Sequence, residues 1–213
     1  MKNATSLVSS TFGVIVGIAG FEHGVGEMLQ GNVTPAAPSI LSWPNSSIFK
    51  ILGGEPAMTI LPNLTLAGIL TILMSIGIII FSVGFIQKKF ASLVMVFLSI
   101  LLLLAGGGYA PPVLGVVTAI GALLIHTPIR WLKANLPGIV LRGSSRLWPW
   151  VFGICLTLWF YLFPGSIILS FLFGLNNPML IIPISFSALG FLILTFIIAF
   201  GSDVDRARQG QPA

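Results

Sequence analysis

Six long stretches of this chain contain few charged residues, and they constrain its fold more than any other feature. They cover about residues 9–30, 60–86, 89–107, 110–127, 148–173 and 179–201. Charged residues make up 7% of the chain and hydrophobic residues 56%, whereas about 25% of the residues in a soluble domain are charged. A soluble domain needs a polar surface, and this chain has too few polar residues to form one. The sequence therefore predicts an integral membrane protein whose surroundings are the lipid bilayer.

The apolar stretches have the length and pattern of membrane-spanning helices. A helix needs about 20 residues to cross the hydrocarbon layer. The stretches are continuously apolar rather than alternating, and a helix satisfies its backbone groups within one segment, so helices are favoured over barrel strands. We expect an all-α, polytopic bundle of about six transmembrane spans. Pro164 and Gly165 predict a kink in the fifth span, and two short segments in its place are the alternative.

The basic residues predict the orientation. If the N-terminus lies inside, nine of the ten Lys and Arg residues fall in inner segments, and Lys50 alone falls outside. By the positive-inside rule, both termini are then cytoplasmic, and we expect a prokaryotic cytoplasmic membrane. The inner residues are Lys2, Lys88, Lys89, Arg130, Lys133, Arg142, Arg146, Arg206 and Arg208. The net charge of +5 is too thinly spread to indicate a nucleic-acid partner.

The chain divides into one long domain and a short end. We expect a single transmembrane helical domain over residues 1–201 and a polar, disordered cytoplasmic tail over 202–213. The basic stretch 128–150 predicts an inner loop.

Segment 31–59 is rich in Pro, Gly, Ser and Asn, and a loop of this length predicts local structure on the outer side. We expect a short helix around Ser46–Leu52 and a turn at Gly53 and Gly54. The second span would then open at Glu55 and Pro56.

Glycine residues form a stripe along the first span. They recur at spacings of three, four and seven residues, which places them on one face of a helix. Small residues at such spacings let a second helix approach closely within lipid. The stripe therefore predicts a helix-packing face made of Gly13, Gly17, Gly20, Gly24 and Gly31.

Ionisable residues collect near the outer end of the first span. His23 and Glu27 are i,i+4 neighbours on the glycine-lined face, with Gln30 at its edge. Glu22 points roughly the opposite way. Glu55 precedes the second span at the same outer level. We therefore expect an outer-facing site of His23, Glu27 and Glu55 with Gln30 beside it, and whether Glu22 joins them stays open.

Three functions fit such a site, since charges inside a membrane are costly and mark a functional site or a partner. Imidazole with carboxylates suits Zn²⁺ or another divalent cation, so His23, Glu27 and Glu55 are the candidate metal ligands and a divalent cation is the candidate cofactor. The same groups could exchange protons, and we expect binding or translocation of a cation or protons in transport.

The second interpretation is structural: His23 and Glu27 lock segment 31–59 onto the bundle, or the chain is a non-catalytic subunit whose glycine stripe docks onto a larger membrane complex or a homo-oligomer. The third is a membrane enzyme that performs acid–base chemistry on a lipid-like substrate. The sequence has no HExxH or phosphate-loop pattern and no evident Ser or Cys nucleophile beside a base. It therefore favours a non-enzymatic function.

Overall fold

The structure, a computed structural model, is mainly helical and describes residues 3–127, 130–174 and 177–210. Four helical segments are long and apolar enough to cross a membrane. They are α1 (Ala4–Leu29), α2 (Leu64–Ile80) with the π-turn η2 (Phe81–Phe85), α6 (Gly138–Phe160) continued into α7 (Ser166–Phe173), and α8 (Ile181–Arg208). Two shorter apolar helices accompany them, α3 (Ala91–Ala105) and α4 (Ala110–Leu123) with the 3₁₀ turn η3 (Leu124–His126). The mainly helical fold is therefore confirmed, and the four long apolar helices support the predicted membrane bundle.

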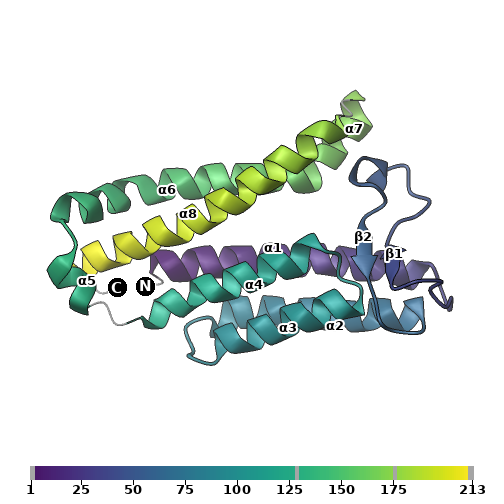
Figure 1. The fold of residues 1–213 in the computed structure, drawn as a ribbon, viewed down its shortest axis with the longest axis horizontal. Coiled ribbons are helices and arrows are strands. Elements are labelled where there is room, and N and C mark those ends of the chain that lie inside the picture. Colours follow the sequence, from purple (N-terminus) through teal and green to yellow (C-terminus); the bar gives the residue numbers. More distant parts are fainter. Residues whose placement is uncertain (1–2, 128–129, 175–176, 211–213) are drawn as a thin grey trace.

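The helices run side by side along the long axis of the molecule (Figure 1). The central helix α1 packs on α2, α4 and α8, while α6 pairs with α8 and α3 lies against α2 and α4. Both ends of the chain lie at one end of the bundle, near α5 (Arg130–Asn135). The two-stranded sheet and α7 lie at the opposite end.

The core lies around the first half of α1. Val8, Phe12 and Val16 are fully buried there. The ring of Phe12 meets Phe152 and Trp159 of α6 edge-on, with ring centroids 6.4 and 6.3 Å apart. These contacts join the α6–α8 pair to the rest of the bundle.

Four of the five glycines in the predicted stripe pack against another helix. A Cβ atom on Gly13, Gly17, Gly20 or Gly24 would meet atoms of α2 or η2. Gly31 is different: its φ is +83°, and no described atom lies within 4 Å of where its Cβ would be. It lies beyond the last turn of α1, directly after the capping residue Gln30, so its assignment to the packing face is wrong.

Segment 31–59 is structured, as predicted. Strand β1 (Ser39–Leu41) pairs antiparallel with β2 (Pro56–Met58), and the turn η1 (Phe49–Leu52) lies between them. We call residues 39–58 the hairpin. The predicted turn at Gly53 and Gly54 is confirmed by their positive φ angles, whereas the predicted helix is reduced to η1.

The predicted start of the second span at Glu55 and Pro56 is wrong. Pro56 belongs to β2, where its missing N–H is tolerated at the end of a short edge strand. Helix α2 begins at Leu64, because the Asn63 side chain accepts a hydrogen bond from Leu66 N (3.0 Å) and so caps the helix.

The predicted inner loop 128–150 is largely helical, although residues 128 and 129 lie outside the described part of the chain. Helix α6 begins at Gly138, directly after Pro137. Leu141 is fully buried, and the Ser145 hydroxyl donates to the Asp205 carboxylate of α8 (2.7 Å). These contacts with the end of α8 keep the polar stretch helical.

The predicted kink in the fifth span is confirmed. The π-turn η4 (Tyr161–Gly165) separates α6 from α7, and Phe163 has non-helical φ and ψ angles. The 3₁₀ turn η5 (Pro178–Leu180) then leads directly into α8.

The predicted disorder of the tail is wrong for residues 202–208. Helix α8 continues to Arg208, and Asp203 and Asp205 are buried. Asp203 accepts hydrogen bonds from Ala4 N (2.7 Å) and Thr5 N (2.9 Å) at the start of α1. The polar end is thus part of the fold, because it supplies partners for otherwise unpaired backbone groups. Lys2 and residues 211–213 lie outside the described residues.

Candidate metal centre

The hairpin carries two side chains to the end of α1. Ser42 N donates to Glu55 O and Trp43 N to Gly54 O, both at 3.0 Å, which extends the strand pairing by two residues. Ser42 and Glu55 thus lie opposite each other at the ends of the two strands, and the side chains of both contact His23 of α1. Glu55 has a φ of +58° and is the one non-glycine residue with positive φ in the described part of the chain. Such strained conformations gather at functional sites.

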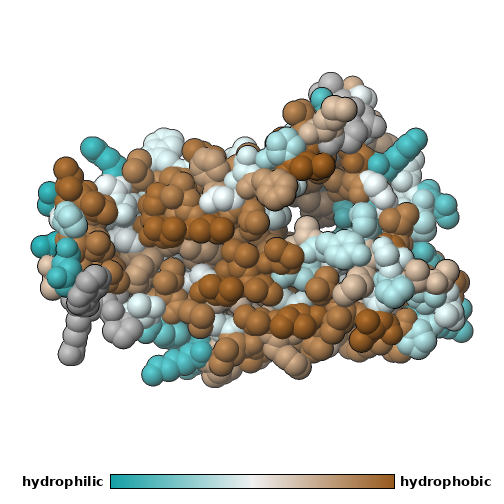
Figure 2. All heavy atoms as spheres, in the orientation of Figure 1, coloured by the Kyte–Doolittle hydropathy of each residue, from teal (hydrophilic) through white to brown (hydrophobic). Residues whose placement is uncertain are grey.

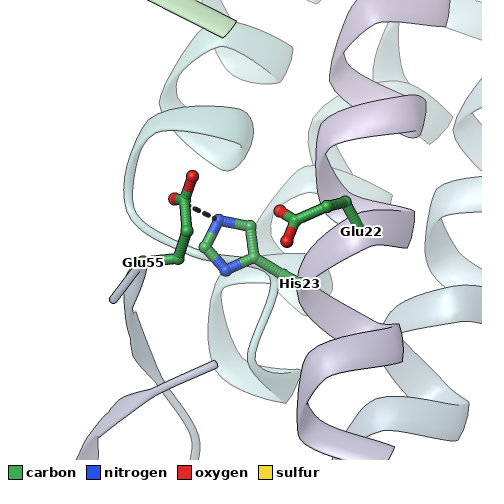
Figure 3. Close-up of side chains that lie close together, drawn as sticks. All are labelled: Glu22, His23 and Glu55. Carbon is green, nitrogen blue, oxygen red and sulfur yellow. Dashed lines mark ion pairs between the residues drawn. The ribbon is translucent and has the colours of Figure 1, made fainter. Parts of the chain in front are cut away.

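Glu22, His23 and Glu55 form a compact cluster (Figure 3), which we call the triad. The His23 Nε2 atom lies 3.2 Å from the Glu55 Oε2 atom. One ligand atom from each of the three residues lies within 4.8 Å of the others. In a tetrahedral zinc site with bonds of about 2.0–2.2 Å the ligand atoms lie about 3.4 Å apart, so the three side chains would close in on a bound ion. The triad therefore has the composition and nearly the spacing of a divalent cation site.

Ser42 orients the imidazole of His23. The His23 Nδ1 atom lies 2.8 Å from the Ser42 Oγ atom, and His23 is only 3% exposed. In the tautomer with its proton on Nδ1, His23 donates to Ser42 and directs the lone pair of Nε2 towards Glu55. Histidine ligands of metals are commonly held in this way, by an acceptor on the second ring nitrogen.

Glu27 lies behind His23 and is separated from the triad by Ser42. Its carboxylate accepts long hydrogen bonds from the Ser42 hydroxyl (3.4 Å) and the Thr71 hydroxyl (3.5 Å). Glu27 is fully buried. The cluster that the structure brings together therefore differs at one position from the predicted ligand set of His23, Glu27 and Glu55, because it contains Glu22 in place of Glu27.

The two sets differ because helical spacing fixes the direction in which a side chain leaves the helix and not the point that its functional group reaches. His23 and Glu27 share a face, as predicted, but the imidazole turns towards the hairpin and the carboxylate towards α2 and the turn after α3. Glu22 is about 100° from His23 around the helix, and its longer side chain reaches the same point.

The glycine-rich turn between α3 and α4 closes over the site. A Cβ on Gly106 (φ +134°) would meet the Glu27 carboxylate, and a Cβ on Gly108 (φ +76°) would meet the His23 ring. Both residues thus combine a positive φ with close approach to a buried side chain, which only glycine allows.

Gln30 lies away from the triad and holds the hairpin. Its side-chain amide donates to the carbonyl groups of Leu41 (3.0 Å) and Ser42 (2.9 Å), and also to Gly26 (3.3 Å). These bonds fix Ser42 relative to α1, so Gln30 contributes to the site by positioning.

A cavity of about 270 Å³ adjoins the triad. Figure 2 shows the surface hollowed at this level, between the hairpin and the α6–α8 pair. Trp43 Nε1 lies close to the Glu22 carboxyl, but neither this atom nor Glu22 Oε1 has a partner with hydrogen-bond geometry among the described residues, although both are buried. The triad thus keeps unused bonding capacity.

No protein-family model matches this chain, and no curated protein and no solved structure matches it. The functional conclusion therefore depends on the geometry of the triad and its surroundings.

Proposed function

We propose that this protein binds a divalent transition-metal cation at the triad and presents or translocates it at the outer face of a membrane. The observation that carries the proposal is the convergence of three ligand atoms within 4.8 Å in a protein of apolar helices. One imidazole and two carboxylates suit Zn²⁺, Mn²⁺ or Fe²⁺. When both carboxylates are ionised, their charge offsets that of the cation, and the pairing offsets part of the cost of removing the three charges from water.

The surroundings of His23 support the same proposal. Ser42 holds the imidazole with Nε2 facing the carboxylates, and Glu27 in turn accepts from Ser42. The line from Glu55 through His23 and Ser42 to Glu27 also consists of groups that can pass protons. Proton exchange coupled to cation binding therefore belongs to the proposed function.

The proposed arrangement in the membrane has six spans with both termini in the cytoplasm of a prokaryotic cell. Its support is the arrangement of the connections. Both ends of the chain, α5 and the connection between α2 and α3 lie at one end of the bundle, whereas Lys50 lies at the other end, in the hairpin (Figure 1). This arrangement follows the positive-inside rule. Helix α3 has 15 residues, or about 22 Å of length, so a span there requires local thinning of the bilayer.

A matched pair of variants tests the cation site. Glu22→Gln and Glu27→Gln make the same chemical change on the same helix, inside the triad and behind it. The chelator-stripped protein in lipid nanodiscs is titrated with Zn²⁺ and Mn²⁺, and bound metal is measured by elemental analysis. We expect one ion per wild-type chain, affinity reduced about 100-fold or more in Glu22→Gln, and affinity within about 10-fold of wild type in Glu27→Gln. A wild-type chain without bound metal, or a Glu22→Gln variant that binds as tightly as wild type, would refute the proposal.

A further inference from the structure

The cavity beside the triad combines a polar end with an apolar body. The polar end is formed by Glu22, His23 and Glu55. Ile15 and Ala19 of α1, Leu114 of α4, and Trp159 and Phe163 near the kink provide apolar walls. Ionisable groups thus gather on one part of a cavity that is otherwise mostly hydrophobic.

The cavity is elongated along α1. Ile15 and Glu22 both line it and are seven residues apart in the same helix, which corresponds to about 10 Å. It therefore extends from the triad for about two helical turns towards the middle of the first span. An occupant that uses the whole cavity must be polar at one end and apolar along its length.

Two other hollows on the bundle lack this combination. Leu70 and Met74 line one, and Val113 and Val117 line the other, and neither hollow has an ionisable residue among its described lining. Both are mainly apolar grooves of the kind that lipid chains fill. The cavity at the triad differs from them because three of its side chains, those of Glu22, His23 and Glu55, can interact with a polar head group.

We propose that this cavity takes a single-chain amphiphile of the fatty-acid class from the bilayer. The inference rests on the proposed cation site: the carboxylate of the ligand binds the cation held by the triad, and its alkyl chain runs along α1 past Ala19 towards Ile15. Without the cation, Glu22 and Glu55 would repel an anionic head group, whereas the bound cation attracts it. The volume of about 270 Å³ lies below the usual range of small-molecule sites, about 300–1,000 Å³, which favours one chain over a two-chain phospholipid.

The apolar walls set the expected chain-length preference. Each methylene group removed from water contributes about a fourfold gain in affinity. Octanoate should therefore bind much more tightly than acetate, although the two carry the same head group. A site that binds only through the cation would not distinguish them.

Two serines of α8 provide a matched pair of variants. Ser185 lines the cavity, while Ser187 is exposed outside it, and each hydroxyl donates to the carbonyl group four residues before it (2.7 and 2.8 Å). Ser185→Phe fills the cavity, and Ser187→Phe adds the same bulk to the outer surface. Ala19→Leu fills the cavity from α1 and serves if Ser185→Phe does not fold.

The experiment uses full-length protein in non-ionic detergent, loaded with Co²⁺, whose visible absorption reports its ligands. Bound Co²⁺ is quantified first, and octanoate and acetate are then titrated. We expect octanoate to change the spectrum at concentrations at least about 30-fold lower than acetate does. Ser185→Phe should keep Co²⁺ but lose this preference, and Ser187→Phe should behave as wild type.

The outcomes separate the two proposals. A wild-type protein that does not bind Co²⁺ overturns the cation site and this inference with it. A protein that binds Co²⁺ and responds equally to octanoate and acetate overturns only the amphiphile. The amphiphile is also overturned if both cavity-filling variants keep the preference for octanoate.

Discussion

Carboxylates lie at both ends of α1, but their surroundings differ. At the first turn, Asp203 accepts three short hydrogen bonds, from Ala4 N, Thr5 N and Thr5 Oγ1, at 2.7–2.9 Å. Near the last turns, the bonds to Glu27 are 3.4 and 3.5 Å long, and Glu22 Oε1 has no partner with hydrogen-bond geometry among the described residues. The Asp203 carboxylate is thus well bonded, whereas the carboxyl groups of Glu22 and Glu27 keep unused bonding capacity.

The helix dipole explains why this difference matters. The start of a helix carries partial positive charge and stabilises an anion such as Asp203, whereas the end of a helix carries partial negative charge. Glu27 lies in the last turn of α1 (Ala4–Leu29), where the dipole opposes negative charge, whereas Glu22 lies about two turns before the end of the helix. A cation at the triad would offset the charge of Glu22 and Glu55, in keeping with the proposed function, whereas Asp203 has a structural role at the first end.

The largest expected effect is on the structural end. Asp203→Ala removes all three hydrogen bonds and leaves buried backbone N–H groups of α1 unpaired, and each such group costs about 1–3 kcal/mol. We expect the free energy of unfolding to fall by about 3–5 kcal/mol. Denaturant titration in mixed micelles, followed by circular dichroism, measures this loss.

Glu27→Gln is the control at the other end. It is nearly isosteric and replaces a carboxylate that accepts only long hydrogen bonds, so the free energy of unfolding should change by less than about 1 kcal/mol. If Asp203→Ala is as stable as wild type, or Glu27→Gln loses more stability than Asp203→Ala, the contrast between the two ends fails.

The sequence predicts the helices well because charge-free apolar runs of this length have few alternatives. Its errors fall where polar residues pack inside. The first span is predicted from residue 9, but α1 starts at Ala4, since Ala4 and Thr5 are buried and donate hydrogen bonds to Asp203 of α8. The polar composition that predicts a disordered tail does not reveal that Asp203 has a partner 198 residues away.

The site is predicted in part. His23 and Glu55 are identified because ionisable residues are rare in this chain and share one level. Glu22 is left open because a helical wheel gives the direction of Cβ and not the reach of the side chain. Ser42 carries no periodic signal, since it comes from a hairpin whose pairing depends on contacts beyond its own sequence.

An intermediate effect is expected at the turn that closes over His23. Gly108→Ala must hold alanine at a φ of +76° and place its Cβ against the imidazole. Gly174→Ala imposes a similar φ of +63°, and no described atom lies within 4 Å of that Cβ position. Positive φ alone costs about 1–2 kcal/mol, so both variants lose this much stability, and Gly108→Ala loses at least about 1 kcal/mol more.

Metal binding distinguishes the two glycine variants further. Only Gly108→Ala should weaken Zn²⁺ binding, because only it displaces a ligand. Denaturant titration and Zn²⁺ titration of both variants check this expectation. Equal stability losses together with unchanged Zn²⁺ affinity would show that the turn does not position His23.

The smallest effect is expected at Ser42. This prediction tests whether cation binding depends on the orientation of the His23 ring as well as on the charge of the carboxylates. Ser42→Ala leaves all three triad side chains in place but removes the acceptor of His23 Nδ1. The imidazole can then rotate or change tautomer, so Zn²⁺ affinity should fall about 10-fold. Ser10→Ala is the control. It removes the same group from a buried position, on α1, where Ser10 Oγ has no hydrogen-bond partner among the described residues. Zn²⁺ titration in nanodiscs should show wild-type affinity for Ser10→Ala, and the same result for Ser42→Ala would mean that the two carboxylates, rather than an oriented histidine, hold the ion.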